Sequence, residues 1–303
     1  MRPVQVVVAG AQGLLGGALV GHLTEQGHRV RRLVRRPVVS PAEIPWDPAA
    51  GRLDAASLEG VDAVVNLGGV GIGDHRWTAR YRQEILRSRT SPTGLLARTL
   101  ASLDTPPRVL LQASAVGFYG DRGDTELDET SPAGTGFLPD VVRAWEAATE
   151  PASGHCRVVH LRTGIVLAPR GGALGRLLPI LRLGIGGPLG DGRNVWPWIT
   201  LHDHVRAMAH LLDSPVTGPV NLTAPHPARQ GDVVRALSRE LHRPAVVPVP
   251  RVALRLALGE FADDILSSQR AYPRVLVADG FRFDHARVEG AAAWVTDQAA
   301  RRR

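Results

Sequence analysis

Three glycines near the start of the chain have a spacing suited to holding a phosphate group. The segment Gly10-Ala11-Gln12-Gly13-Leu14-Leu15-Gly16 follows a short apolar run, Val4 to Ala9, and opens a stretch with helical spacing from Leu14 to Leu23. Glycine lets the backbone approach a ligand closely, and the free N–H groups at a helix start attract phosphate. The alternative is a tight strand-to-helix turn that binds nothing. The residues predicted to contact the pyrophosphate of a dinucleotide are Gly10, Gly13, Leu14, Leu15 and Gly16.

A pair of arginines follows the second predicted strand, Arg29 to Val34. An NAD-specific protein usually places an acidic residue there to hold the ribose 2′-hydroxyl, but no acidic residue occurs between Glu25 and Glu43. A guanidinium can instead bind a 2′-phosphate through two hydrogen bonds. Arg35 and Arg36 therefore predict NADP(H) as cofactor, in preference to NAD(H). A solvated basic strand end is the alternative.

A serine stands where another predicted strand, Arg108 to Ala113, ends in the segment Gln112-Ala113-Ser114-Ala115-Val116-Gly117. Ligands bind at the carboxyl ends of the strands in open α/β sheets, so Ser114 can hydrogen-bond a substrate carbonyl or hydroxyl beside the cofactor. Tyr119 follows five residues later and either contacts the substrate or packs at the base of its loop. Ser114 and Tyr119 are the candidate catalytic residues, and Ser114 is also a candidate cofactor contact.

The usual partners of such a serine are missing. Reductases of this architecture pair a tyrosine with a lysine four residues on, but all 36 basic residues of this chain are arginine. The absence of lysine also excludes Schiff-base and P-loop chemistry. No Tyr-x-x-x-Arg exists either, and if Glu146 marks the following turn, the expected pair falls on the apolar Leu138 and Val142. A genome composition that favours arginine over lysine explains the missing lysine, but it does not explain the missing tyrosine.

Other polar residues near the same sheet edge have two interpretations each. Arg162, which ends a strand starting at Arg157, either holds an anionic group of a ligand or forms a structural ion pair. The acidic residues from Asp121 to Glu129 either form a solvated lid, which is the expectation, or supply an acid–base pair. His202-Asp203-His204 is similar to a metal cluster, but adjacent helical residues point in different directions, so we expect Asp203 to cap a helix and predict no metal site.

The elements that position these residues alternate between strand and helix. Further strands are predicted at Asp62 to Leu67 and Val220 to Leu222, and a helix from Arg80 to Leu103 is expected to break or kink at Pro92. Such alternation predicts a Rossmann-type, doubly wound parallel sheet of the α/β class. The glycine-rich composition after Gly171 and the later helices predict a smaller α-rich unit. We therefore predict a cofactor-binding domain at residues 1–222 and a smaller substrate-side domain at residues 223–303.

Composition limits the cellular environment and the kinds of partner that we expect for the protein. The 303 residues are 44% hydrophobic and 21% charged, and the single Cys156 excludes an internal disulfide and fits a reducing cytoplasm. The net charge of +7 comes from scattered arginines without a groove-sized basic and aromatic cluster, so no nucleic-acid partner is expected. No apolar run approaches the ~20 residues that span a bilayer, so no membrane partner is expected either.

Several ordered motifs resemble one family, the atypical extended short-chain dehydrogenase/reductases. The similarity is to the NADP-dependent, epimerase-like branch that ends in a small C-terminal domain of unknown function. The matching segments include the glycine motif, Asp62 to Gly69, Ser114 to Gly120, Arg162 to Leu167, and Gly280 to Phe283. The resemblance implies that Leu67, Gly68 and Gly69 lie along the cofactor, as part of a cleft for a polar substrate. Phe118 departs from the family's first tyrosine and leaves Tyr119 as the only phenol near Ser114.

Together these features predict an NADP(H)-dependent oxidoreductase or epimerase-like enzyme that acts on a polar small molecule of the sugar or carbonyl kind. The alternative is a protein that binds NADPH as a sensor or store without turnover, because the tyrosine and lysine of the usual proton transfer are absent. The sequence does not specify the oligomeric state.

Overall fold

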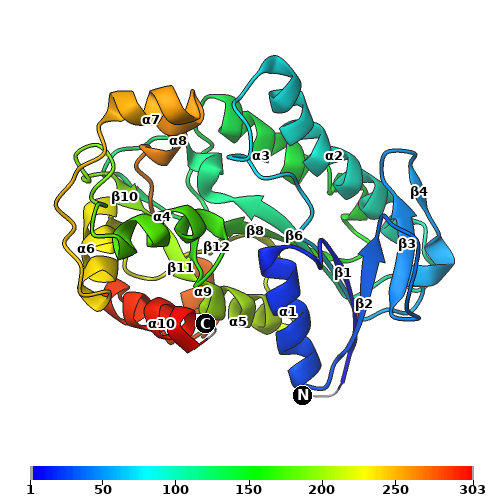
Figure 1. Ribbon diagram of the computed structural model, residues 1–303. Helices are drawn as coiled ribbons and strands as arrows, with labels where there is room; N and C mark the ends of the chain where they lie inside the picture. The colour runs from blue at the N-terminus through cyan, green and yellow to red at the C-terminus, as the bar shows by residue number, and fades with distance from the viewer. Residues whose placement is uncertain (1–2, 302–303) are drawn as a thin grey trace.

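The computed structural model describes residues 3–301 and has a large sheet at its centre (Figure 1). The sheet has eight strands in the order β12-β8-β6-β5-β1-β2-β3-β4, and every pairing is parallel except that of β3 with β4. This confirms the predicted doubly wound, Rossmann-type fold. The strands are β1 (Gln5–Ala9), β2 (Arg29–Val34), β3 (Glu43–Asp47), β4 (Arg52–Leu53), β5 (Ala63–Asn66), β6 (Val109–Ala115), β8 (Arg157–Thr163) and β12 (Gly218–Leu222).

Apolar residues on both sides of each central strand explain why the sheet is covered on two faces. In β1, Val6 and Val8 point into one core cluster, whereas Val7 and Ala9 point into another. Successive side chains of a strand alternate between faces, so a strand that is apolar throughout must be buried twice. Helices α1 (Leu14–Glu25) and α5 (Leu201–Asp213) cover the first face, and α2 (Ala79–Ala101) covers the second with α3 (Phe137–Ala147) against it (Figure 1).

Pro92 does not interrupt the long helix as expected. Helix α2 runs without a break from Ala79 to Ala101 with Pro92 inside it. Proline removes one helical hydrogen bond, but the turn that follows packs Leu95, Leu96 and Leu100 into the core. Burial of that apolar face therefore outweighs the lost bond. The predicted break is wrong, and a kink at Pro92 stays a prediction.

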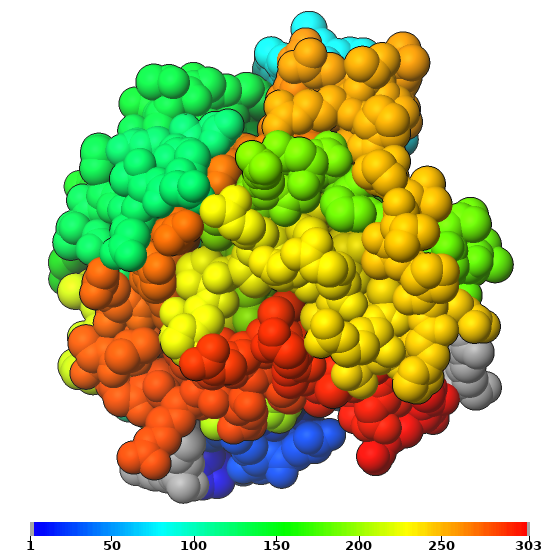
Figure 2. Space-filling model, turned by 90° about the vertical axis from the view of Figure 1, so that its left-hand side faces the viewer, coloured from blue at the N-terminus to red at the C-terminus, as the bar shows by residue number. Residues whose placement is uncertain are grey.

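A further core cluster, in addition to the two on the faces of the sheet, lies beside the carboxyl edge of the sheet. Helices α4 (Gly172–Arg182), α6 (Gln230–Glu240) and α10 (Val288–Arg301) bury one another's apolar faces there, together with Trp196 and Trp198. Because α4 precedes residue 222 and the others follow it, this core joins segments from both sides of the predicted domain boundary, which stays a prediction. Figure 2 shows the outer face of this region, where the yellow, orange and red segments adjoin.

The remaining elements are short strands, helices and 3-10 turns. They are the paired strands β7 (Glu126–Leu127) with β14 (Arg270–Ala271), β9 (Ile165–Leu167) with β11 (Trp198–Thr200) and β10 (Val195–Trp196) with β13 (Ala228–Arg229), the helices α7 (Arg251–Leu258), α8 (Phe261–Ile265) and α9 (Arg274–Ala278), and 3-10 turns at Ala55–Leu58, Val116–Tyr119 and Glu150–Ala152. Within residues 3–301, no helix combines the length and apolar composition needed to cross a membrane.

Helices α7 and α8 reach across to the loop after β5. The Phe261 ring lies where a side chain on Gly73 would project, and it packs near Trp77 with ring centroids 5.7 Å apart. The Arg76 guanidinium donates to the Leu256 carbonyl, and these two residues are 180 positions apart in the sequence. This α7–α8 bridge joins the C-terminal part of the chain to the edge of the sheet where the site residues gather.

Candidate functional site

Two glycines of the motif, Gly10 and Gly16, form a cradle in which no larger residue would fit. Gly10 has a φ of +77°, and a Cβ added there would lie 2.8 Å from the Leu67 carbonyl carbon. A Cβ on Gly16 would lie 2.2 Å from the Gly10 carbonyl oxygen. Helix α1 is capped by Gly13, so no side chain accepts hydrogen bonds from its first-turn N–H groups. The turn can therefore hold a phosphate group on backbone N–H donors, which fits the pyrophosphate of a dinucleotide.

The two arginines after β2 differ in their surroundings. Arg36 forms a double hydrogen bond with Glu43, at 2.5 Å from Nη2 to Oε1 and 3.1 Å from Nη1 to Oε2. Arg35 is exposed and has no side-chain partner among the described residues. The charge of Arg36 is therefore already balanced by a carboxylate, whereas the charge of Arg35 is available to a ligand.

The strand order brings the remaining site residues to one edge. Strands β1, β5, β6 and β8 are parallel neighbours, so Gly10, Gly68 and Ser114 follow one another along their carboxyl ends. Behind them, the buried Asn66 amide donates to Gln112 Oε1 at 2.9 Å and ties β5 to β6. The structure thus gathers the sequence-predicted residues at the ligand-binding edge of the sheet.

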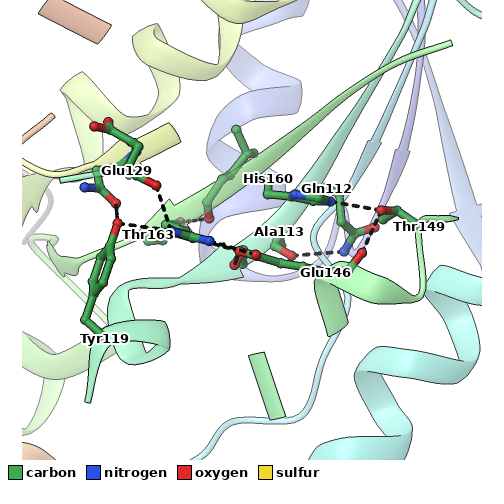
Figure 3. Close-up of polar contacts among 12 residues, drawn as sticks. Gln112, Ala113, Tyr119, Glu129, Glu146, Thr149, His160 and Thr163 are labelled. Atoms are coloured by element: carbon green, nitrogen blue, oxygen red, sulfur yellow. Dashed lines mark hydrogen bonds and ion pairs between the residues drawn. The ribbon is translucent and has the colours of Figure 1, made fainter. Parts of the chain in front are cut away.

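Ser114 belongs to a chain of polar contacts. Figure 3 shows this chain around Glu146 and Tyr119. Its hydroxyl donates to Glu146 Oε1 at 2.5 Å. The Glu146 carboxylate also accepts two hydrogen bonds from Arg162, both at 2.9 Å, from Nε and Nη2. The Arg162 guanidinium stacks over the Phe118 ring at 3.5 Å from its centroid. The structure thus places Arg162 in the ion pair that the sequence left as one of two alternatives, and a ligand contact by Arg162 stays a prediction.

The ion pair fixes the ionisation of both partners. Burial disfavours the charge on Glu146, but the hydrogen bonds and the positive charge of Arg162 outweigh it, so the pKa of the Glu146 carboxyl is lowered. Burial likewise acts against the charge on Arg162, and Glu146 nevertheless raises the Arg162 pKa. Glu146 is therefore ionised at neutral pH and can only accept hydrogen bonds. As a result, the Ser114 proton is directed toward Glu146, and the lone pairs of the Ser114 oxygen are left for a ligand.

Tyr119 lies in the same network without access to solvent. Its hydroxyl donates to Asn221 Oδ1 at 2.8 Å and accepts from Arg162 Nη1 at 3.2 Å. The residue has no exposed surface, and burial raises the pKa of its phenol. Of the two roles considered for Tyr119, the packing role is the one for which the structure provides contacts; a catalytic role stays a prediction.

Glu129 is buried rather than part of a solvated lid. Its Oε1 atom accepts from the backbone N–H groups of Asn221 at 3.0 Å and Val275 at 3.3 Å, while Oε2 has no partner among the described residues. These contacts hold the Glu129 side chain in the interior of the protein. The expectation of a solvated side chain is therefore wrong for Glu129. Burial raises the pKa of the Glu129 carboxyl.

The Glu129→Gln variant is expected to gain stability relative to the wild type as pH rises. The raised pKa means that the folded state binds the Glu129 proton more tightly than the unfolded state, so the wild type loses stability as pH rises toward the folded-state pKa. An amide has no charge to bury, so the difference should grow by roughly 1–3 kcal/mol in favour of the variant between pH 4 and pH 8. Urea unfolding at both pH values tests this. The exposed Glu126→Gln is the matched control, and an equal response of both variants would contradict the prediction.

The His202-Asp203-His204 segment does not have the predicted arrangement. The helix cap is Thr200, whose hydroxyl accepts from the Asp203 N–H at 3.1 Å, so the expected capping by Asp203 is wrong. Asp203 instead accepts from the backbone N–H groups of Asp284 and His285, because the C-terminal chain folds back onto α5. His202, Asp203 and Asp284 lie near one another. Arg206 is 3.0 Å from each of the two carboxylates and offsets one of their two negative charges.

A separate cavity lies outside the predicted site. It has a volume of about 340 Å³ and opens on the face shown in Figure 2, between the starts of α6 and α10. None of the predicted site residues lines it. Its walls include Arg229, Arg270 and Arg287 together with Asp232 and Glu289, so positive and negative charges are mixed.

Glu146 and Asn221 are site residues that were not identified from the sequence. Glu146 was considered only as a marker of a helical turn, yet it joins Ser114 to Arg162. The signal that could have found it is its place on the helix after Ser114, since a carboxylate there faces the strand that carries Arg162. A parallel sheet with β6 beside β8 would have predicted the meeting of the three side chains.

The fold and the glycine cradle define a dinucleotide-binding Rossmann protein. Comparison with known families gives a match to the NAD dependent epimerase/dehydratase family over residues 6–223 and to a domain of unknown function, DUF1731, over residues 249–295. The chain belongs to the NAD dependent epimerase/dehydratase family. The atypical extended short-chain dehydrogenase/reductase type expected from the sequence is thereby confirmed.

Curated relatives match almost the whole chain. Epimerase family protein Mb2239 of Mycobacterium bovis is 43% identical, over 98% of this chain and 99% of its own. Epimerase family protein SDR39U1 of Homo sapiens is 34% identical, over 92% of this chain and 95% of its own.

Solved structures agree with the fold. Human SDR39U1, crystallised with NADPH, is similar with a TM-score of 0.90 and 32% identity, covering 97% of this chain and 99% of its own. MoeE5 in complex with UDP-glucose and NAD has a TM-score of 0.75 at 22% identity, over 98% of this chain and 99% of its own, and shows the shared fold.

Proposed function

We propose that the protein is an NADP(H)-dependent oxidoreductase or epimerase-like enzyme that acts on a polar small molecule of the sugar or carbonyl kind. The observation that carries the proposal is the juxtaposition, on one sheet edge, of a cradle that fits only glycine with a serine held by a buried carboxylate. The NADPH bound by human SDR39U1 supports the choice of cofactor. A cytoplasmic location without nucleic-acid or membrane partners is part of the same proposal.

The cofactor would lie along the ends of β2, β1, β5 and β6. The first turn of α1, with Gly10, Gly13, Leu14, Leu15 and Gly16, would hold the pyrophosphate, and Leu67, Gly68 and Gly69 would form the adjoining wall. The nicotinamide supplies hydride transfer when bound. Arg162 lies behind this surface, where it holds Glu146 in place.

Ser114 would orient the reacting group of the substrate. Because its proton is donated to Glu146, its oxygen accepts a hydrogen bond from the ligand, and the fitting partner is a substrate hydroxyl. Glu146 therefore acts as a positioning residue that fixes the direction of the Ser114 hydroxyl. A substrate alcohol held in this way would present its C–H bond to the cofactor edge.

The test is turnover with purified protein. NADPH with a panel of carbonyl, quinone and nucleotide-sugar substrates, and NADP⁺ with the matching alcohols, are monitored by absorbance at the reduced nicotinamide band. We expect at least one compound to be converted and Ser114→Ala to lower kcat/KM by about 10²-fold or more. Unchanged turnover in Ser114→Ala and Tyr119→Phe would refute the site assignment.

Arg35→Ala is expected to weaken NADPH binding by roughly 10- to 100-fold and to leave NADH binding unchanged. A charge-assisted hydrogen bond to a phosphate contributes about 1.5–3 kcal/mol, and Arg35 has no competing partner among the described residues. Arg36→Ala should have a smaller effect on affinity, because that guanidinium already pairs with Glu43. Fluorescence titration of both variants with both cofactors tests the prediction; equal losses for NADPH and NADH would contradict it.

A second function, NADPH binding without turnover, is favoured by one observation. Among the described residues, Tyr119 carries the phenol that lies in the Ser114 network, and its hydroxyl is buried with both its donor and its acceptor function in use. A sensor or store would bind NADPH and show no conversion of any compound in the panel.

A further inference from the structure

The cavity between the starts of α6 and α10 has no part in the proposed mechanism. Its volume of about 340 Å³ lies at the lower end of the range of about 300–1,000 Å³ that is usual for small-molecule sites. It opens on the face shown in Figure 2, and none of the predicted cofactor or catalytic residues lines it. A molecule bound there would therefore be a second ligand, separate from the cofactor.

Three arginines from different elements surround this cavity. Arg229 ends β13, Arg270 lies in β14, and Arg287 immediately precedes α10. Because the three side chains start from separate segments, their guanidinium groups can contact one ligand from different directions. A tetrahedral phosphate presents oxygens in several directions, and a guanidinium binds two of them through paired hydrogen bonds. The arrangement therefore suits a phosphate group better than a planar carboxylate.

The neighbouring carboxylates do not neutralise these arginines. Arg229 and Arg270 share a single carboxylate, that of Asp124, at 3.7 Å and 3.1 Å. The Asp232 carboxylate, which also lines the cavity, accepts a hydrogen bond from Arg235 on the next turn of α6. The charged residues of the wall, three arginines and two carboxylates, thus leave a net positive charge around the cavity.

Arg287 is the guanidinium that is most available to a ligand. Within residues 3–301, no carboxylate lies within ion-pair distance of Arg287, and the residue is exposed at the mouth of the cavity. Glu289 is the second carboxylate of the wall and is also exposed, so water screens its charge. An anion can therefore pair with Arg287 without first displacing a protein carboxylate.

We propose that this cavity binds a small phosphate-bearing molecule through Arg229, Arg270 and Arg287. The exposed His226 borders the same cavity and adds a ring N–H donor. The phosphate would provide the counter-charge that Asp124, shared between two arginines, does not supply. This binding site is independent of the proposed function, because it uses no residue of the cofactor edge.

The test is a calorimetric titration with pyrophosphate, in the absence and in the presence of NADPH. Arg287→Gln is expected to weaken pyrophosphate binding at least tenfold, because it removes a charge-assisted pair of hydrogen bonds. Arg239→Gln is the matched control, since Arg239 is exposed in the last turn of α6 and does not line the cavity. It should change the affinity less than twofold. Glu289→Gln should strengthen binding about two- to fivefold, because it removes a negative charge from the wall.

The titrations also separate the cavity from the glycine cradle, where pyrophosphate could bind in place of the cofactor. Binding to the cavity persists when NADPH is present. Pyrophosphate binding that NADPH abolishes, or that Arg287→Gln leaves unchanged, would overturn the proposal. Tighter binding of citrate than of pyrophosphate would overturn the choice of phosphate, and weaker binding in Glu289→Gln would overturn the choice of an anion.

Thermal unfolding gives a second readout that does not depend on NADPH. Pyrophosphate should raise the Tm of the wild type and of Arg239→Gln, and it should raise the Tm of Arg287→Gln much less, because a ligand stabilises only the protein that binds it. Equal shifts in all three proteins would contradict the assignment of Arg287. A wild type that binds pyrophosphate in the cavity and fails to bind NADPH would refute the proposed function and leave the cavity site intact.

Discussion

Replacing Gly16 with alanine is expected to weaken NADPH binding by roughly a hundredfold or more and to destabilise the fold. The new Cβ would lie 2.2 Å from the Gly10 carbonyl oxygen and 2.8 Å from Ala11 Cα, and both are backbone atoms that cannot rotate away. The turn must open to relieve this overlap, which costs about 2–3 kcal/mol. The displaced N–H groups would no longer contact the phosphate. The NADPH affinity should therefore fall by roughly a hundredfold or more, which corresponds to about 2.8 kcal/mol of binding free energy.

Gly21→Ala on the same helix is the matched control for Gly16→Ala. No atom lies within 4 Å of a Cβ added at Gly21, so alanine should raise stability by about 0.5–1 kcal/mol through its helix propensity. Thermal unfolding with and without NADPH, together with a fluorescence titration, measures both effects. A Gly16→Ala protein that binds NADPH like the control would show that the cradle does not hold the pyrophosphate.

Replacing Glu146 with alanine should cause the largest loss of stability among the polar site residues. The Arg162 side chain is 5% exposed and that of Glu146 is 12% exposed, so the variant leaves a buried guanidinium without its carboxylate. Breaking a buried ion pair from one side costs about 3–5 kcal/mol. The Ser114 hydroxyl also loses its acceptor, so any turnover should fall even at temperatures where the variant remains folded.

An exposed pair on the same helix provides the control for Glu146→Ala. Arg143 pairs with Asp140 at side-chain exposures of 56% and 59%, and exposed pairs contribute about 0–1 kcal/mol. Chemical denaturation of Arg143→Ala and Glu146→Ala at pH 7 compares the two directly. Similar midpoints for the two variants would mean that the Glu146–Arg162 pair does not hold the site together.

The sequence was informative about the elements whose apolar pattern is strong. Strand β2 has the predicted bounds, and the expected parallel sheet is confirmed, because buried β-branched runs next to glycine turns have few other solutions. The break expected at Pro92 did not occur, because tertiary burial of α2 offsets the local cost of a proline inside a helix. Strand β3 and the two-residue strands were not expected, since short elements depend on partners that lie far away in the sequence.

Only those site residues that a local sequence motif marks could be predicted from the sequence. The position between a strand and a helix is enough to identify Gly10, Gly16 and Ser114 as candidates. By contrast, only side-chain contacts across the sheet bring Glu146 and Asn221 into the site. Glu43 illustrates the same limit, since its pairing with Arg36 depends on β3 lying beside β2. Charge pairs between distant segments leave no periodic trace in a sequence.

The α7–α8 bridge has a consequence for how the protein is made. The loop that carries Arg76 leaves the ribosome 180 residues before Leu256, and translation at about 5–20 residues per second separates the two by on the order of ten to forty seconds. During that interval Trp77 and the aromatic surface around it have no Phe261 to cover them. The nascent chain should therefore expose the aromatic surface around Trp77 until α7 and α8 have been synthesised.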